Sequence, residues 1–159
     1  DPKLAPTEKV VKRFSPELKK IWLTALQKEQ PDVRRRACFA ISLASRRGIT
    51  GLEATVPHLK KLVESEDEAQ LIRLEAARAL ISLNETSAAP ALLALAKRDI
   101  VEYSVTLEPA LARWQFVGAK DLWLGRLSSQ SSNSVGVIAA IRGLGALGGK
   151  DLATHIISS

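Results

Sequence analysis

The sequence predicts an all-α fold, a solenoid of about four stacked helical hairpins. Two apolar motifs recur along the 159 residues. The first motif, Leu-x-x-Leu, recurs at steps of 36, 33 and 32 residues: Leu23/Leu26, Leu59/Leu62, Leu92/Leu95 and Leu124/Leu127. The second motif is alanine followed by leucine or isoleucine, at steps of 39, 31 and 30 residues: Ala40-Ile41, Ala79-Leu80, Ala110-Leu111 and Ala140-Ile141. No segment alternates apolar and polar residues between hairpin turns, so we predict no strands.

Helix signals divide each period into one shorter and one longer helix. Ser15 and Pro16 supply a capping hydroxyl and a first-turn proline, so the first solenoid helix is expected to begin there. Pro31 ends that helix and Asp32 caps the next one, which Gly48 closes. The predicted helices cover residues 16–28, 33–47, 54–64, 68–83, 88–97, 100–115, 119–128, 134–147 and 150–158.

Three features of the later helices carry specific expectations. Asp67 and Glu68 place negative charge at a helix N-terminus, where the helix dipole favours it. Pro109 lies inside a predicted helix and is expected to bend or break it, because proline lacks the backbone donor. The fourth period is rich in glycine, which predicts either loose packing or packing too tight for a larger side chain. These glycines are Gly136, Gly143, Gly145, Gly148 and Gly149.

The repeats predict one solenoid domain over residues 15–159, preceded by an N-terminal arm or capping helix at residues 1–14. The repeats are expected at about 15–48, 52–84, 87–116 and 118–148, with a partial repeat at 149–159. The partial repeat is indicated by a match between residues 118–122 (Gly-Ala-Lys-Asp-Leu) and 148–152 (Gly-Gly-Lys-Asp-Leu). The chain contains no methionine, so we expect a mature or trimmed fragment of a longer product.

Residues 72–80 read Ile-Arg-Leu-Glu-Ala-Ala-Arg-Ala-Leu, an apolar-arginine pair followed by small residues and a leucine. This pattern resembles the second helix of a HEAT repeat, in the short form of about 30 residues found in phycobilin-lyase-like HEAT proteins. Residues 32–44 are a looser copy, and the resemblance covers roughly residues 15–159. It implies a right-handed superhelix with the first helices on the convex side and the second helices on the concave side.

The resemblance also implies a ladder between repeats, formed by an aspartate and an arginine six residues apart. Asp67 and Arg73 match that spacing. In the first repeat Arg34 is present, but Lys28 stands where the aspartate is expected. Serine replaces the arginine in the third and fourth repeats: Ser104 and Ser134. We therefore expect an incomplete ladder, with the later repeats held together by packing.

No residue pattern indicates catalysis. The sequence holds no Gly-x-Ser-x-Gly, glycine-rich phosphate loop, His-Glu-x-x-His or Cys-x-x-Cys. The two histidines, His58 and His155, lie about three repeats apart and cannot share a metal ion within one chain. Cys38 lies among apolar helix residues and is expected to be a small buried core residue. We predict no enzyme activity, no cofactor, no metal site and no membrane span, since every apolar run is too short.

Basic residues give the clearest indication of a binding surface. Residues 1–47 hold 12 lysines and arginines against 5 acids, a net charge of +7, whereas the whole chain carries +6. Such an excess either attracts an anionic partner or forms an ordinary solvated surface. Four arginines on the second helices are predicted to contact a partner: Arg35, Arg36, Arg78 and Arg113. Two others, Arg34 and Arg73, are expected to be structural.

We predict a non-catalytic protein-interaction or scaffold module, a fragment of a longer protein that binds a protein partner on its concave face. One alternative is a nucleic-acid-binding module that uses the basic first repeat. Another, implied by the resemblance to phycobilin-lyase HEAT proteins, is a lyase accessory or tetrapyrrole-binding protein, although no catalytic group for it is identified. The single cysteine fits either a reducing or an oxidising compartment, so the localisation stays open.

Overall fold

The computed structural model describes residues 13–129 and 134–148, and over these residues the fold is all-helical. Eight α-helices follow one another as four hairpins: α1 Pro16–Ala25, α2 Pro31–Arg46, α3 Val56–Glu64, α4 Gln70–Ser82, α5 Ala89–Ala96, α6 Val101–Arg113, α7 Lys120–Ser128 and α8 Ser134–Ala146. A short 3-10 turn leads into each of α3, α5 and α7: Glu53–Thr55, Thr86–Ala88 and Val117–Ala119. The predicted α-solenoid is confirmed, and the predicted helix ends differ from the observed ones by at most three residues.

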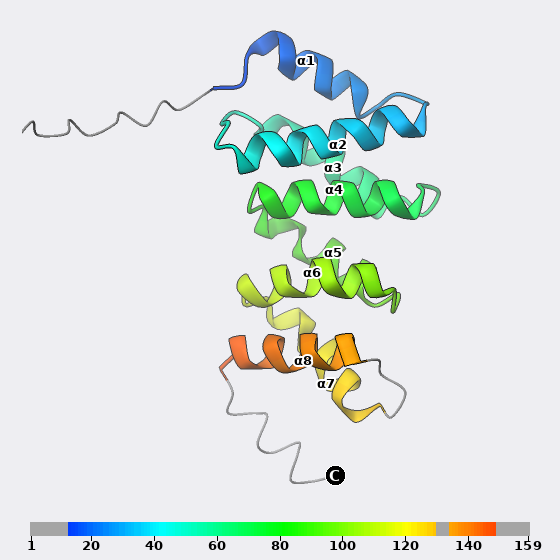
Figure 1. Cartoon of the computed structure of the whole chain (residues 1–159), viewed down its shortest axis with the longest axis vertical. Coiled ribbons are helices and arrows are strands. Elements are labelled where there is room, and N and C mark those ends of the chain that lie inside the picture. The colour runs from blue at the N-terminus through cyan, green and yellow to red at the C-terminus, as the bar shows by residue number, and fades with distance from the viewer. Residues whose placement is uncertain (1–12, 130–133, 149–159) are drawn as a thin grey trace, which may run out of the picture.

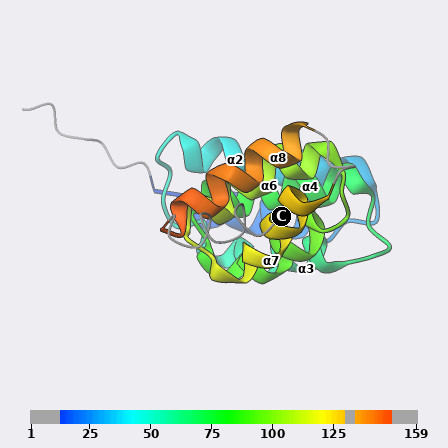
Figure 2. The same ribbon diagram turned by 90° about the horizontal axis from the view of Figure 1, so that it is seen from below.

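The helices form two layers along the stack (Figures 1 and 2). In one layer α2, α4, α6 and α8 lie side by side, each packed against the one before it. Behind them α3, α5 and α7 form the second layer. Between the layers runs a core of fully buried side chains that includes Ile41, Leu59, Leu80, Leu92, Leu107 and Leu111. Because each hairpin buries its apolar side against its neighbours, the core is built up one repeat at a time.

The first helix departs from this arrangement, because α1 lies at the end of the stack beyond α2 (Figure 1). No residue of α1 is fully buried, and Ile21 is 59% exposed. Trp22 holds the helix in place through a tilted contact with the ring of Phe14, at 4.5 Å between centroids. The backbone N–H of Phe14 donates to the carbonyl of Thr50 at 2.9 Å. Thr50 lies in the connector 47–52, which is three residues longer than its counterparts 83–85 and 114–116 and matches the longer first step of the Leu-x-x-Leu motif.

Each second helix is followed by a residue with a left-handed backbone. These residues are Gly48, Asn84, Gln115 and Gly148, with φ angles of 77°, 54°, 50° and 106°. Gly48 ends its helix as predicted, since glycine adopts this conformation without a steric cost. Asn84 adopts the same backbone conformation although it carries a Cβ atom. Its Oδ1 accepts a hydrogen bond from Nε1 of Trp114, one repeat later, at 2.7 Å. The helix end therefore also joins two repeats.

Pro109 does not break its helix, so that part of the expectation is wrong. The α6 helix runs without interruption from Val101 to Arg113, with Pro109 inside it. Proline removes the hydrogen bond to the carbonyl four residues earlier, which belongs to Val105. Both Pro109 and Val105 are exposed on α6, the side of the helix where solvent can compensate for a missing backbone donor.

Several predictions lie outside the described residues. The N-terminal arm or capping helix falls almost wholly within residues 1–12, and only Arg13 and Phe14 of it are described. The partial fifth repeat, the predicted helix 150–158 and His155 fall within residues 149–159. Among the residues that are described, the single β-type contact is a bridge between Arg13 and Thr50, and no strand forms.

Candidate functional site

Two of the predicted partner-binding residues, Arg35 and Arg36, share one carboxylate at the start of α2. Arg35 Nη2 lies 2.9 Å from Oδ1 of Asp32, and Arg36 Nε lies 2.8 Å from Oδ2. The hydrogen bond from Arg35, assisted by the charge of Arg36, holds the pKa of Asp32 below its ordinary value. Asp32 thus stays ionised and offsets part of the positive charge of both arginines.

The other two, Arg78 and Arg113, are exposed on α4 and α6. Arg78 Nη1 lies 2.8 Å from Oε1 of Glu75, one turn earlier on the same helix. Arg113 has no hydrogen-bond or ion-pair partner among the described residues. Three of the four predicted arginines are therefore paired with a carboxylate of their own helix, and Arg113 keeps an uncompensated charge.

Apolar side chains lie beside these arginines on the outer surface of the second helices. We call this surface the second-helix face and define it by its exposed residues: Arg36, Phe39, Arg78, Val105, Pro109, Ile138 and Arg142. Phe39, Arg78 and Pro109 each precede one of the recurring alanines and are exposed on α2, α4 and α6, which pack against one another in that order. The side chains of Phe39, Val105 and Ile138 are 50%, 57% and 49% exposed.

Between α6 and α8 the second-helix face is hollowed into a pocket of about 160 Å³. Its lining is mostly apolar and includes Val105, Pro109, Ala112, Val135 and Ile138. Arg142 adds a guanidinium that has no ion-pair partner among the described residues. The pocket therefore combines an apolar surface with one uncompensated positive charge.

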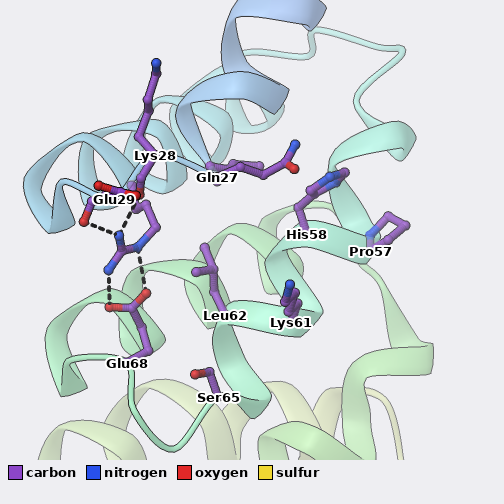
Figure 3. A pocket seen from close by; sticks show the side chains of 11 residues that line it. Gln27, Lys28, Glu29, Pro57, His58, Lys61, Leu62, Ser65 and Glu68 are labelled. Carbon is purple, nitrogen blue, oxygen red and sulfur yellow. Dashed lines mark hydrogen bonds and ion pairs between the residues drawn. The ribbon is translucent and has the colours of Figure 1, made fainter.

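A larger cavity, of about 540 Å³, lies on the other side of the stack, between the end of α1 and helix α3 (Figure 3). Leu26 and Leu62 contribute apolar surface, and His58 and Lys61 contribute polar groups from α3. No part of the sequence analysis predicted it. The only sequence signal is the longer first step of the repeat motifs, which reflects the displaced position of α1.

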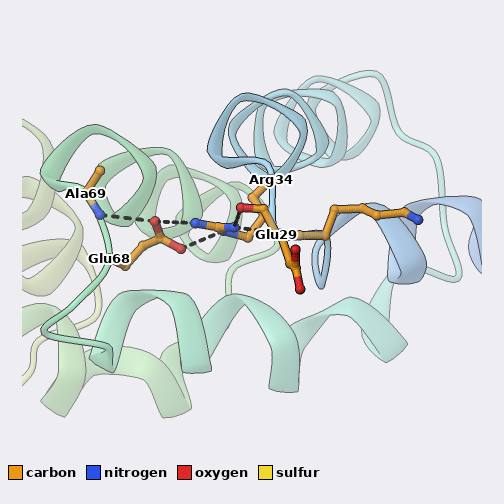
Figure 4. A network of polar contacts seen from close by, with 5 residues as sticks. Glu29, Arg34, Glu68 and Ala69 are labelled. Carbon is orange, nitrogen blue, oxygen red and sulfur yellow. Dashed lines mark hydrogen bonds and ion pairs between the residues drawn. The ribbon is translucent and has the colours of Figure 1, made fainter.

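Arg34 lies at the edge of this cavity and joins the first two repeats (Figure 4). Its Nε and Nη2 donate to the two carboxylate oxygens of Glu68 at 2.7 and 2.9 Å. Its Nη1 donates to the carbonyls of Lys28 and Glu29 at 2.6 and 2.8 Å. Glu68 also accepts from the backbone N–H of Ala69 at 3.0 Å. Arg34 thus has a structural role, and its hydrogen bonds lower the pKa of Glu68.

The ladder between repeats that the resemblance implies does not run through Asp67 and Arg73 in the described residues. Asp67 is exposed, whereas Arg73 is 5% exposed and its Nε donates to the carbonyl of Val63 at 3.0 Å. Between the first and second repeats, Glu68 forms the ion pair instead, with Arg34.

Arg126 is a structural residue that the sequence analysis missed. It is 6% exposed, and its Nη2 donates to the carbonyl of Ala96 at 3.3 Å and to Oγ of Ser104 at 3.0 Å. The same Nη2 lies 2.8 Å from Oε1 of Glu108, and Nη1 donates to Asp99 at 2.9 Å. Arg126 thus links α7 to α5 and α6, in the repeats where arginine was found to be missing.

The glycines of α8 make room for this cluster. A Cβ on Gly143 would lie 2.3 Å from the indole of Trp123, and a Cβ on Gly136 would lie 2.8 Å from Arg126. Trp123 is fully buried, and its Nε1 donates to Oε2 of Glu108 at 3.1 Å. Of the two packing alternatives left open by the sequence, tight packing is correct at these two positions. Gly145, by contrast, has nothing near its Cβ position.

Glu108 is the most deeply buried acid of this cluster, at 1% exposure. Burial raises the pKa of its carboxyl above the ordinary value, while the charge of Arg126 acts in the opposite direction. Oε1 faces Arg126 at ion-pair distance but receives no directed hydrogen bond from the described residues. The arrangement is that of a buried ion pair with incomplete hydrogen bonding, which is a structural feature more than a catalytic one.

No catalytic or metal-binding cluster is found in the part of the chain that the structure describes. Cys38 is fully buried, and burial raises the pKa of its thiol to about 12, so it is not a thiolate at neutral pH. No three side chains of histidine, cysteine, aspartate or glutamate come together there. Within the same residues, no helix has the length and apolar character that a membrane crossing requires.

Comparison with known proteins agrees with this architecture. A family model described as HEAT repeats matches residues 20–106, which span the first two hairpins and most of the third. A search of curated proteins found no significant match.

Proposed function

This chain belongs to the HEAT-repeat family, and on that premise we propose that its second-helix face binds a segment of a partner protein. HEAT repeats are generally protein-interaction scaffolds, and the family is typically non-catalytic. The family match covers more than half of the chain. Beyond this general role, we assign binding to the second-helix face and to a partner segment that carries an apolar side chain next to a carboxylate.

The observation that carries the proposal is the pocket between α6 and α8. Exposed Val105 and Ile138 form its apolar part, and the guanidinium of Arg142 lies beside them. A protein segment with an apolar side chain next to a carboxylate satisfies both features at once, since the apolar part is removed from water while the carboxylate pairs with arginine. Arg113 adds a second uncompensated charge on α6.

A nucleic-acid partner is less well supported by the same surface. Phosphate binding requires a continuous stripe of available cations. Asp32 and Glu75 instead pair with Arg35, Arg36 and Arg78, the arginines that suggested such a stripe. The exposed apolar residues between them also fit a protein better than a phosphate backbone.

The tetrapyrrole alternative stays a prediction, because no described residue favours it over other ligands. Cys38, the one thiol of the chain, is buried at 0% exposure and cannot reach a ligand on the surface. No catalytic group for a lyase step has been identified among the described residues.

Capture from a lysate of cells that express the protein natively tests the proposal. The bait is compared with the double variant Val105→Asp/Ile138→Asp, which places charge in the pocket at exposed positions. Ala94→Asp, an exposed position of α5 in the other layer, is the matched control. We expect a discrete protein that the wild type and Ala94→Asp retain and the double variant loses. Equal capture by all three baits would contradict the chosen surface.

A further inference from the structure

The cavity between α1 and α3 is separate from the second-helix face and plays no part in the proposed function. Its volume of about 540 Å³ lies within the range of roughly 300–1,000 Å³ that is typical of small-molecule sites. It is contributed by two repeats: residues 26–29 and Arg34 from the first, and residues of α3 and the loop after it from the second.

The cavity exists because α1 does not occupy the layer of α3. Further along the stack, α3 packs directly against α5, and buried Leu59 and Leu92 belong to these two helices. On the other side of α3, no helix of residues 13–129 and 134–148 takes the corresponding place, since α1 lies beyond α2 (Figure 1). The connector 47–52 holds this position through the contact of Phe14 with Thr50. The cavity is therefore a fixed consequence of the architecture.

Its surface has an apolar part and a polar part. Leu26 and Leu62 are 2% and 8% exposed, and with Pro57 they supply the apolar part. Lys61 and His58 supply polar groups from one side of α3, which faces the segment that carries Gln27 (Figure 3). Nδ1 of His58 is itself buried, with no hydrogen-bond partner among the described residues, so a ligand in the cavity does not reach this atom.

The charges around the cavity leave a positive excess. Arg34 and Glu68 neutralise each other through their bidentate contact. Lys28 and Lys61 have no ion-pair partner among the described residues, and Glu29 is the one remaining acid in the lining. Among the lysine, arginine and acidic side chains of the lining, one positive charge is therefore left over. An anion is thus favoured over a cation or a neutral ligand.

We propose that this cavity binds a small organic carboxylate. The apolar body of the ligand lies against Leu26 and Leu62, and its carboxylate pairs with Lys61. His58 lines the same cavity from α3. The ligand class follows from the combination of an apolar wall and an uncompensated ammonium, each of which matches one part of the molecule.

Two-dimensional amide NMR with 2-naphthoate as the probe tests this site, because it reports where binding occurs. The neutral amide 2-naphthamide has the same apolar body and serves as the ligand control. Lys61→Gln removes the proposed charge, and Lys60→Gln is the matched protein control on the same helix. Lys60 does not line the cavity and instead donates to Oγ of Ser87 at 2.6 Å.

We expect 2-naphthoate to shift the amide signals of residues 26–29 and 57–65, and to bind about fivefold more tightly than 2-naphthamide. Lys61→Gln should remove that preference, whereas Lys60→Gln should keep it. Absence of saturable shifts, shifts that map to α6 and α8, or equal binding of acid and amide would each overturn the proposal. Binding of an acetylated Leu-Leu peptide acid without binding of 2-naphthoate would also overturn it, in favour of a peptide terminus.

Discussion

The guanidinium of Arg126 and the carboxylate of Glu108 meet at 2.8 Å in the core between α7 and α6. Both side chains are almost inaccessible to solvent, at 7% and 0% exposure. An ion pair at this depth is costly to form, because both charges lose their hydration. The ion pair lies in the third repeat, where Ser104 stands at the position that Arg73 occupies in the second repeat.

The carbonyls of Val63 and Ala96 occupy corresponding places in the second and third repeats, but each accepts from an arginine of a different repeat. In the second repeat, Arg73 of α4 donates to the carbonyl of Val63 at the end of α3. The corresponding carbonyl in the third repeat belongs to Ala96, 33 residues later, and Ser104 stands in place of the arginine. Arg126 reaches back from the fourth repeat to donate to both Ala96 and Ser104. The ladder is thus continued by an arginine from the next repeat.

A double-mutant cycle on Arg126 and Glu108 tests this structural role. Arg126→Met and Glu108→Leu should each lower the free energy of unfolding by about 3 kcal/mol, because each leaves a buried charge without its partner. The double variant should lose clearly less than the sum, since an apolar pair replaces both charges. Urea unfolding measures all three. Additive effects would show that the two residues act independently. Arg36→Met, in the exposed pair with Asp32, is the control and should change stability by less than about 1 kcal/mol.

Glycine at position 143 is required by the indole of Trp123. Gly143→Ala should destabilise the protein by about 1–3 kcal/mol, because the added Cβ would collide with a rigid and buried ring. Gly145→Ala, two residues later in the same helix, is the matched control and should stabilise by up to about 1 kcal/mol through helix propensity. Thermal unfolding distinguishes them. Similar stabilisation by both substitutions would contradict the packing described for Trp123.

Stability at acid pH should depend on the Arg34–Glu68 ion pair. The contact with Arg34 lowers the pKa of Glu68 in the folded protein below its ordinary value of 4.5. The pair therefore stabilises the fold fully above that value, and its contribution is lost as the pH falls through the lowered pKa. Glu68→Gln should be destabilising at pH 7 by about 1–3 kcal/mol and progressively less so in acid. A difference from the wild type that stays constant from pH 7 to acid would contradict this linkage. Asp32→Asn, at an exposed pair, serves as the control and should have little effect.

Duplex DNA should bind weakly at physiological salt, because carboxylates of the same helices offset Arg35, Arg36 and Arg78. A random duplex titrated across a salt series measures this, with Arg35→Glu/Arg36→Glu as the variant. Micromolar binding that weakens steeply with salt and is lost in the variant would place nucleic acid first among the partners.

The repeat periods predicted the hairpins, because each apolar stripe must face its neighbours whatever the partner is. They could not predict the position of α1, which depends on how Phe14 and the connector 47–52 pack. Gly48 marked its helix end in the sequence, whereas Asn84 and Gln115 did not, since non-glycine residues rarely adopt a left-handed backbone.

The candidate site was predictable only in part. The sequence located four arginines on the second helices. The carboxylates that pair with Arg35, Arg36 and Arg78 were overlooked, although their spacing of three or four residues on a helix is itself a sequence signal. Arg126 escaped notice because its partners lie 18 to 30 residues earlier in the chain. The sequence shows serine in place of arginine at position 104. It does not show that Arg126 of the next repeat fills that role.

Site-specific photo-cross-linking in cells that express the protein natively tests the role of the second-helix face most directly. A photoreactive phenylalanine analogue is placed at position 39 or 138 of that face, or at position 94 of α5 in the opposite layer. The account predicts a discrete protein adduct from positions 39 and 138 and none from position 94. Adducts from position 94 alone, or adducts with nucleic acid in place of protein, would contradict it.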